Sequence, residues 1–204
     1  MFVFKSKNGR SSIAPRKPIR ALLDFVVSLS LPLNAPLLRA QDSVAVEYRA
    51  KAVFLSNFPI FVDWPADALP TGHAPFLVCV YGAYSFGLSL AEVARTITAH
   101  ERQIEIRWIR KEQELRSCQI LFVSQSEQKK YHRSLDAVRG LSVLTVGETP
   151  EFLGAGGVVS FSTQRGKLEF DVNLDAAQRA HLKISSRMLA LARRVVTGEE
   201  TGKS

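Results

Sequence analysis

The segment EYRAKAVFLSNFPIFVDWP, residues Glu47 to Pro65, combines a helical pattern of apolar residues with an aromatic end. Apolar residues recur here at steps of three and four, which is the spacing of one face of an α-helix. Glu47, Arg49 and Lys51 are predicted to point away from this face, and Pro59 is predicted to end the helix. The predicted apolar face consists of Val46, Ala50, Val53, Phe54 and Phe58.

Three aromatic residues, Phe58, Phe61 and Trp64, lie where the chain leaves this helix. Large rings in such a position either fix the helix on a sheet or stay exposed as contacts for a partner. The sequence pattern is consistent with both roles, core packing and partner binding.

The chain after this helix alternates between strand-like and helix-like segments. Short apolar runs such as FLVCVY are typical of buried strands. Ser85 is placed to cap a helix, and Ser126 precedes a second, amphipathic helix. Such an alternation predicts a three-layer α/β domain with a mostly parallel sheet and helices on both faces. Strands are expected at 76–81, 104–109, 118–124 and 141–148, helices at 85–94 and 127–138, and a helical turn at 111–116.

The carboxyl-terminal part departs from this alternation. GVVSFS and KLEFDV, separated by TQRG at 163–166, predict an antiparallel hairpin at the edge of the sheet. Asn173 is predicted to cap a short helix. A further apolar stripe predicts a closing helix packed on the core, formed by Ile184, Met188, Leu191, Ala192 and Val195.

Residues 1–40 have the order of a secretory signal peptide, in which basic residues precede an apolar run at 21–33. That run is too short to span a bilayer comfortably. We expect cleavage after Ala40, and the alternatives are a retained membrane anchor or a misassigned start. The chain then divides into a signal peptide at 1–40, an α/β domain at 41–197 and a flexible tail at 198–204.

The formal net charge of +8 belongs mostly to this leader. Residues 1–40 contain seven of the 27 Lys and Arg residues and one of the 19 acidic residues. Residues 41–204 therefore carry 20 basic and 18 acidic residues, a net charge of +2. The charges are mixed and form no basic stripe, so the pattern is not that of a nucleic-acid-binding protein.

The chain has two cysteines, Cys79 and Cys118. An even count in an exported protein permits one disulfide, and both residues lie in or beside strand-like runs that adjacent strands would bring within bonding distance. The alternative is a pair of buried, unreactive thiols.

No catalytic or metal-binding motif stands out in the sequence. It contains no G-x-S-x-G elbow, no H-E-x-x-H pair and no C-x-x-C pair. The GAGG segment at 154–157 leads into a strand, as a turn does, whereas a phosphate loop leads into a helix. We therefore expect no enzyme activity, no cofactor and no metal site. The histidines fit solvated positions and not a metal site: His73, His100, His132 and His181.

The most distinctive segments, in chain order, are EYRAKAVFLSNF with FVDWP, FLVCVYG followed by Phe86 and Gly87, CQILFVSQSE, SVLTVGE, and GGVVSF with GKLEFDVNLDAAQRAHLKISSRMLALARRV. In these segments, from about Val46 to Val195, the chain resembles the YfiR family of periplasmic proteins. The resemblance implies a small exported α/β domain. In the best-known members this domain binds the periplasmic sensory part of an inner-membrane diguanylate cyclase and holds it inactive, which limits cyclic di-GMP and biofilm formation.

The resemblance also bears on individual residues. Cys79 and Cys118 occupy the two positions at which the resembled proteins can carry one disulfide, and a second, later cysteine pair of some members is missing. Pro59 stands where a helix-compatible residue is expected, so the first helix should end early or bend. His181 replaces an expected glycine and is predicted to follow a helix in a left-handed conformation.

We predict a non-enzymatic periplasmic regulator that binds and inhibits the sensory domain of an inner-membrane diguanylate cyclase or sensor kinase. The candidate contacts are Phe58, Phe61 and Trp64, together with Arg187 on the exposed side of the closing helix. A homodimer is a further possible state, and no insertion into the membrane is expected after cleavage. The alternatives are a hydrolase and a small-ligand binding module, the latter with a pocket at the carboxyl ends of the strands near 82–87 and Gly147.

Overall fold

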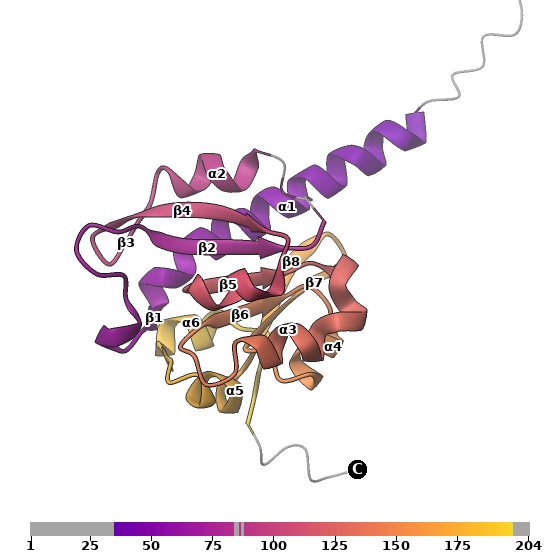
Figure 1. Cartoon of the computed structure of the whole chain (residues 1–204). Helices are drawn as coiled ribbons and strands as arrows, with labels where there is room; N and C mark the ends of the chain where they lie inside the picture. Colours follow the sequence, from indigo (N-terminus) through magenta and orange to yellow (C-terminus); the bar gives the residue numbers. More distant parts are fainter. Residues whose placement is uncertain (1–34, 84–85, 87, 198–204) are drawn as a thin grey trace, which may run out of the picture. The chain divides into compact units, whose positions relative to one another are not determined.

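The structure, a computed structural model, describes residues 35–83, 86 and 88–197 of the 204-residue chain. An eight-stranded sheet with helices on both faces forms its centre (Figure 1). The predicted α/β fold with a mostly parallel sheet is therefore confirmed. Residues 1–34 of the predicted signal peptide and the predicted tail at 198–204 lie outside the described residues.

The main sheet is built from strands of two to eight residues, and a separate two-stranded antiparallel ribbon joins β1 (Val62–Asp63) to β9 (Lys183–Ile184). The strands of the main sheet are β2 (Phe76–Tyr81), β3 (Thr98–Ala99), β4 (Arg102–Ile109), β5 (Ile120–Val123), β6 (Leu144–Gly147), β7 (Val159–Gln164), β8 (Lys167–Asn173) and β10 (Arg194–Val196).

Their spatial order is β10-β8-β7-β6-β5-β2-β4-β3. Strands β4, β2, β5, β6 and β7 run parallel to one another, whereas β3 pairs antiparallel with β4, and β7 and β8 form an antiparallel hairpin. Every residue of β5 and of β6 is buried, because helices cover both faces of the sheet at these strands. This double burial explains the continuous apolar runs in the sequence.

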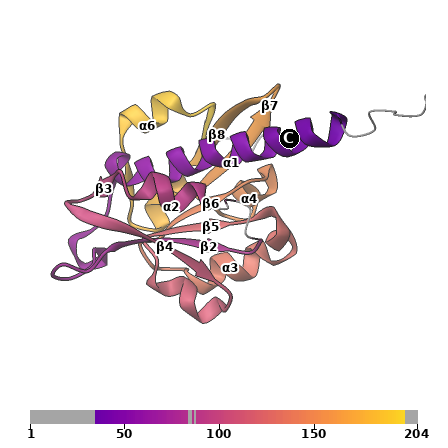
Figure 2. The same ribbon diagram turned by 90° about the horizontal axis from the view of Figure 1, so that it is seen from above.

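The helices form two layers (Figure 2). Helices α1, α2 and α6 lie on one face of the sheet and α3 lies on the other. Two apolar cores correspond to these layers, and α5 contributes to the first and α4 to the second. The helices are α1 (Ala35–Phe61), α2 (Ser89–Ala94), α3 (Tyr131–Ala137), α4 (Pro150–Gly154), α5 (Leu174–Arg179) and α6 (Ser186–Leu191), with 3-10 turns η1 (Ala66–Ala68), η2 (Glu112–Ser117) and η3 (Gln125–Lys130).

Helix α1 differs from its prediction in two respects. It includes Pro59 and ends at Phe61, so the prediction that Pro59 ends the helix is wrong. Proline at this position forfeits the backbone hydrogen bond to the carbonyl of Leu55, and the helix continues for only two residues beyond it. The buried face is also rotated, since Val46 and Val53 are exposed. The residues that α1 buries include Lys51, Ala52, Leu55, Ser56 and Phe58.

Two predicted helices begin elsewhere. Helix α2 begins at Ser89, later than predicted, and Ser85 lies outside the described residues. The predicted helix at 127–138 is split into η3 and α3. Its cap is Ser124, whose Oγ accepts a hydrogen bond from the backbone N–H of Ser126 at 3.4 Å. Ser126, which was predicted to precede the helix, lies within η3.

The predicted hairpin is present, but it does not lie at the edge of the sheet, because β10 pairs in parallel with β8. Its turn residues Arg165 and Gly166 both have positive φ angles, 51° and 77°, as a two-residue type I′ turn requires. The predicted cap at Asn173 is confirmed, since its Oδ1 accepts from the backbone N–H of Ala176 at 2.9 Å. His181 has φ 55°, which confirms its left-handed conformation.

The predicted closing helix is wrong at both ends, since Ile184 lies in strand β9 and the helix is shorter than its apolar stripe. Helix α6 ends at Leu191, and Val195 lies in strand β10. Buried Asp171 of β8 accepts hydrogen bonds from Arg193 and Arg194, and the backbone N–H of Arg193 donates to the carbonyl of Phe170 at 2.8 Å. These bonds hold the chain in an extended conformation beside β8. They stabilise the strand although the spacing of its apolar residues is that of a helix.

Candidate protein-docking site

The four predicted contact residues lie in different environments. Phe58 and Trp64 are core residues that are only 2% and 7% exposed. Trp64 packs edge-on against Phe76, with ring centroids 5.1 Å apart. Phe61 is half-buried and Arg187 is exposed. Core packing accounts for Phe58 and Trp64, whereas partner contact by Phe61 and Arg187 stays a prediction.

An apolar groove with a volume of about 240 Å³ lies between α1 and α6, and we call it the α1–α6 groove. On its rim, Val53 is 45% exposed and Leu191 is 64% exposed. Asn57 is the single polar residue among those that line it. The groove is lined by Val53, Phe54, Asn57, Phe58, Phe61, Phe170, Met188 and Leu191.

The floor of the groove is a cluster of aromatic rings from α1, β7 and β8. Phe58 stacks on Phe161 with ring centroids 5.9 Å apart and meets Phe170 edge-on at 5.7 Å. Phe54 meets Phe170 at 5.5 Å. Rings packed in this way have little freedom to move, so the groove presents a preformed apolar surface.

Leu191 was predicted to pack on the core, and Val53 was placed on the apolar face of the first helix, but both side chains are exposed at this groove. Exposed apolar side chains gathered over a hollow are typical of a surface that binds another molecule. Apolar residues cover a wider face of α1 than the face that the helix buries. These additional apolar residues were the signal in the sequence for an exposed apolar surface. Arg187 is four residues before Leu191 on α6, so the two lie on the same face of that helix.

The carboxyl end of β6 carries a buried ion pair. Nζ of Lys51 lies 2.7 Å from Oε2 of Glu148, and the two side chains are 5% and 3% exposed. Glu148 also accepts hydrogen bonds from the hydroxyl of Tyr48 at 2.9 Å, from the backbone N–H of Gln125 at 2.7 Å and from the hydroxyl of Ser124 at 3.2 Å. The carboxylate therefore joins α1 to the loop after β5.

The charges of this pair determine its behaviour with pH. Burial by itself lowers the pKa of Lys51, but the carboxylates of Glu148 and Glu47 outweigh it, and the pKa is raised. A raised lysine pKa means that the contribution to stability is complete below the ordinary lysine pKa. This contribution is lost as the pH rises through the raised value.

This network occupies the end of the sheet at which a small-ligand pocket was predicted. A side chain at Gly147 would lie 2.2 Å from the ring of Phe152, so the glycine is required by close packing. A larger hollow of about 460 Å³ lies elsewhere, near the amino end of β6, and its lining includes Arg139 and Arg179.

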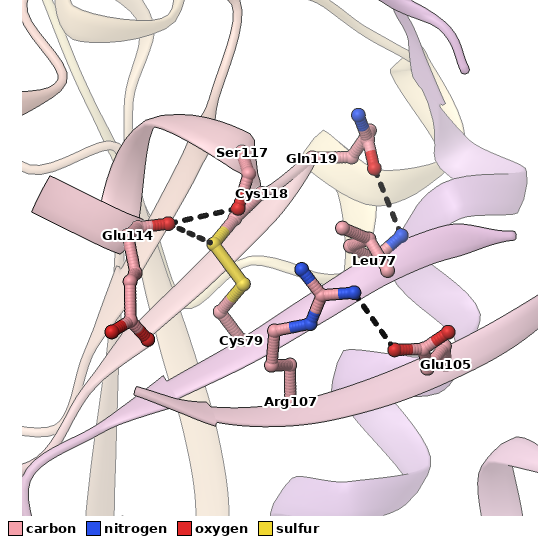
Figure 3. The surroundings of a disulfide bond; sticks show 8 residues. All are labelled: Leu77, Cys79, Glu105, Arg107, Glu114, Ser117, Cys118 and Gln119. Carbon is pink, nitrogen blue, oxygen red and sulfur yellow. Dashed lines mark hydrogen bonds and ion pairs between the residues drawn. A yellow bond between two sulfur atoms is a disulfide. The ribbon is translucent and has the colours of Figure 1, made fainter. Parts of the chain in front are cut away.

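The sheet also contains the predicted disulfide, which joins Cys79 of β2 to Cys118 just before β5 (Figure 3). Both cysteines are buried, and their Cα atoms are 5.9 Å apart. The neighbouring side chain of Gln119 accepts a hydrogen bond from the backbone N–H of Leu77 at 2.8 Å. The bridge and this bond together tie the beginning of β5 to β2.

The double variant Cys79→Ala/Cys118→Ala is expected to lower the free energy of unfolding by about 3 to 4 kcal/mol, because the bridge closes a long loop in the unfolded chain. The sequence separation of the two cysteines is 39 residues. Urea denaturation measures the difference, and reductant should lower the midpoint of the wild type alone. If reductant changed neither the urea midpoint of the wild type nor its mobility on a non-reducing gel, the result would contradict the bridge.

The described residues contain no group of three or more His, Cys, Asp or Glu side chains that could hold a metal ion. His73, His100, His132 and His181 are all exposed. Within the same part of the chain, no helix has both the length and the apolar character needed to cross a membrane.

The chain shows distant likenesses to several solved structures, and two of these likenesses each extend over 59% of the chain. A conserved domain protein from Vibrio cholerae O1 biovar El Tor strain N16961 is 11% identical with a TM-score of 0.45, over 59% of this chain and 54% of that one. The ABC domain in complex with L-Trp from Streptococcus pneumoniae is 9% identical with a TM-score of 0.44, over 59% and 55%. The chain thus spans little more than half of either protein.

No curated protein matches the chain. A family-level match covers residues 48–193, which include most of α1, both cysteines, the hairpin and α6. The matched range agrees with the resemblance found in the sequence. The chain therefore belongs to the YfiR/HmsC-like family of periplasmic regulators.

Proposed function

We propose that this protein is exported by its amino-terminal segment and acts as a negative regulator. Its mature part would bind the periplasmic sensory domain of an inner-membrane signalling protein, a diguanylate cyclase in the first instance and otherwise a sensor kinase. Inhibition of a cyclase would lower cyclic di-GMP and limit biofilm formation. Membership of the YfiR/HmsC-like family supports this proposal, and the buried disulfide is consistent with an oxidising compartment.

The single observation that carries the proposal is the α1–α6 groove. Its lining is apolar apart from Asn57, and it lies between exposed Val53 and Leu191. An apolar or aromatic anchor of the receptor would fill it, and exposed Arg187 beside it would contact the polar rim of the interface. Phe61 would contribute its accessible edge, while Phe58 would support the floor from below.

Inhibition then follows from a difference in affinity. A receptor that exists in active and inactive forms is shifted only by a ligand that binds one form better. A difference of about 3 kcal/mol changes the ratio of the two forms by more than a hundredfold. The preformed groove suits this role, since it needs no ordering of its own before it binds.

Deletion of the coding sequence is expected to raise cyclic di-GMP and surface attachment several-fold, because the cyclase is released. Deletion of the target cyclase as well should abolish the rise, and the wild-type chain should co-purify with that cyclase from membranes. An unchanged cyclic di-GMP level, or a folded product retained in the cytoplasm with its leader, would contradict the proposal. A small ligand that stabilises the chain without any receptor would favour the binding-module alternative.

A further inference from the structure

The outer side of α1 carries a line of exposed apolar side chains. Val46, Val53 and Ile60 follow one another at steps of seven residues and are 69%, 45% and 61% exposed. Seven residues make almost two helical turns, so the three side chains lie along one side of the helix. We call this line the α1 seam. The solvent face of a helix is ordinarily polar, so an apolar line of this kind needs an explanation.

The α1 seam is continuous with the α1–α6 groove. Single exposed apolar side chains are common on protein surfaces, but here most of them gather in one place. Three form the seam, Leu191 lies on the rim of the groove, and Val53 belongs to both. In the described part of the chain, the exposed large apolar side chains are Val44, Val46, Val53, Ile60, Leu88 and Leu191.

The spacing of the seam fits a second helix. Apolar residues at every seventh position form the contact line between two packed helices, and β-branched residues such as valine and isoleucine favour pairs of helices. An α-helix drifts by about 20° over seven residues, so the seam slants across α1 and suits a helix that crosses it at about 20°. From Val46 to Ile60 the seam is about 21 Å long, the length of four helical turns.

The free charges beside this surface are basic. Arg49 is exposed next to the seam, and Arg187 is exposed on α6 at the groove. Glu47 also lies near the seam, but its carboxylate pairs with Nζ of buried Lys51 at 2.6 Å. Charged residues that flank the contact line of two helices determine the choice of partner. The surface is therefore complementary to a helix with acidic flanks.

We propose that the α1 seam and the α1–α6 groove together bind an amphipathic α-helix of the receptor's periplasmic domain. This inference rests on the proposed function and specifies how the receptor is recognised. The receptor helix is at least four turns long and presents apolar side chains at steps of seven residues to the seam. One further apolar side chain enters the groove beside Leu191, and acidic side chains lie opposite Arg49 and Arg187.

Surface plasmon resonance with the purified periplasmic domain of the receptor tests the seam. Val46→Asp, Val53→Asp and Ile60→Asp should each weaken binding by about tenfold or more, because each places a charge in the apolar contact line. Arg49→Glu should weaken binding at low salt and have a smaller effect at high salt. Val44→Asp is the matched control, since Val44 is an exposed valine of α1 that lies off the seam, and binding should be unchanged. Circular dichroism verifies the folding of each variant.

Photo-crosslinking tests the helical form of the bound segment. A benzophenone amino acid in place of Val53 or Ile60 should capture receptor residues about seven positions apart in one segment. Captured residues about two positions apart, which indicate a strand, would overturn the proposal, as would capture of a second copy of this chain. Seam variants with wild-type affinity would also overturn it. If Leu191→Asp alone weakened binding, the proposed function would stand without the helix, whereas a receptor domain that does not bind the wild type would remove both.

Discussion

Lys51→Met is expected to lower the free energy of unfolding by about 3 to 5 kcal/mol, because it leaves the buried carboxylate of Glu148 without its cation. Nζ of Lys51 is 2.7 Å from that carboxylate, and both side chains are almost fully buried. Tyr48, Ser124 and Gln125 would still donate hydrogen bonds to Glu148. Hydrogen bonds from neutral groups compensate only part of the cost of an unpaired buried charge.

Urea denaturation of a matched set of variants measures this effect. Lys51→Met/Glu148→Met should recover much of the loss, since an apolar pair of similar volume replaces the charges. Lys130→Met removes another lysine that pairs with a glutamate, Glu127, but this pair is exposed, so little change is expected. A Lys51→Met protein as stable as the Lys130→Met protein would contradict the importance of the buried pair.

Leu191→Asp is expected to weaken binding to the receptor's periplasmic domain by about 30-fold or more, which corresponds to the loss of one interface hot spot. The substitution places a charge at the rim of the α1–α6 groove, where an apolar anchor of the receptor would enter. Leu191 is 64% exposed, so the free energy of unfolding should change little. Surface plasmon resonance measures the affinity, and urea denaturation measures the stability.

Leu88→Asp is the matched control for this experiment. Leu88 is also an exposed leucine, 71% exposed, but it lies beside α2 and outside the groove. Binding should therefore be unaffected by Leu88→Asp. Equal affinities for the wild type and Leu191→Asp would exclude the groove as the docking site, and equal losses in both variants would point to a general effect of the added charge.

Much of the fold could be predicted from local patterns. The apolar runs of β2 and β5 and the cap at Asn173 lie where the sequence placed them. Each of these features depends on neighbouring residues or on burial on both faces of the sheet. The exposed groove could not be predicted in this way. An apolar residue fits the same helical periodicity whether it packs in the core or is exposed at a binding surface.

The sequence by itself determined the α/β class and the family, since apolar runs, caps and motifs are local properties of the chain. It left a bridge between Cys79 and Cys118 and a pair of unreactive thiols as alternatives, and the structure contains the bridge. Tertiary structure alone decided the burial of Lys51, whose partner Glu148 is 97 residues away. It also turned the end of the predicted closing helix into β10, through the bonds of Arg193 with Asp171. Contacts between residues that are distant in the sequence can contribute more free energy than the local preference for helix or strand. Such contacts cannot be predicted from a local sequence pattern.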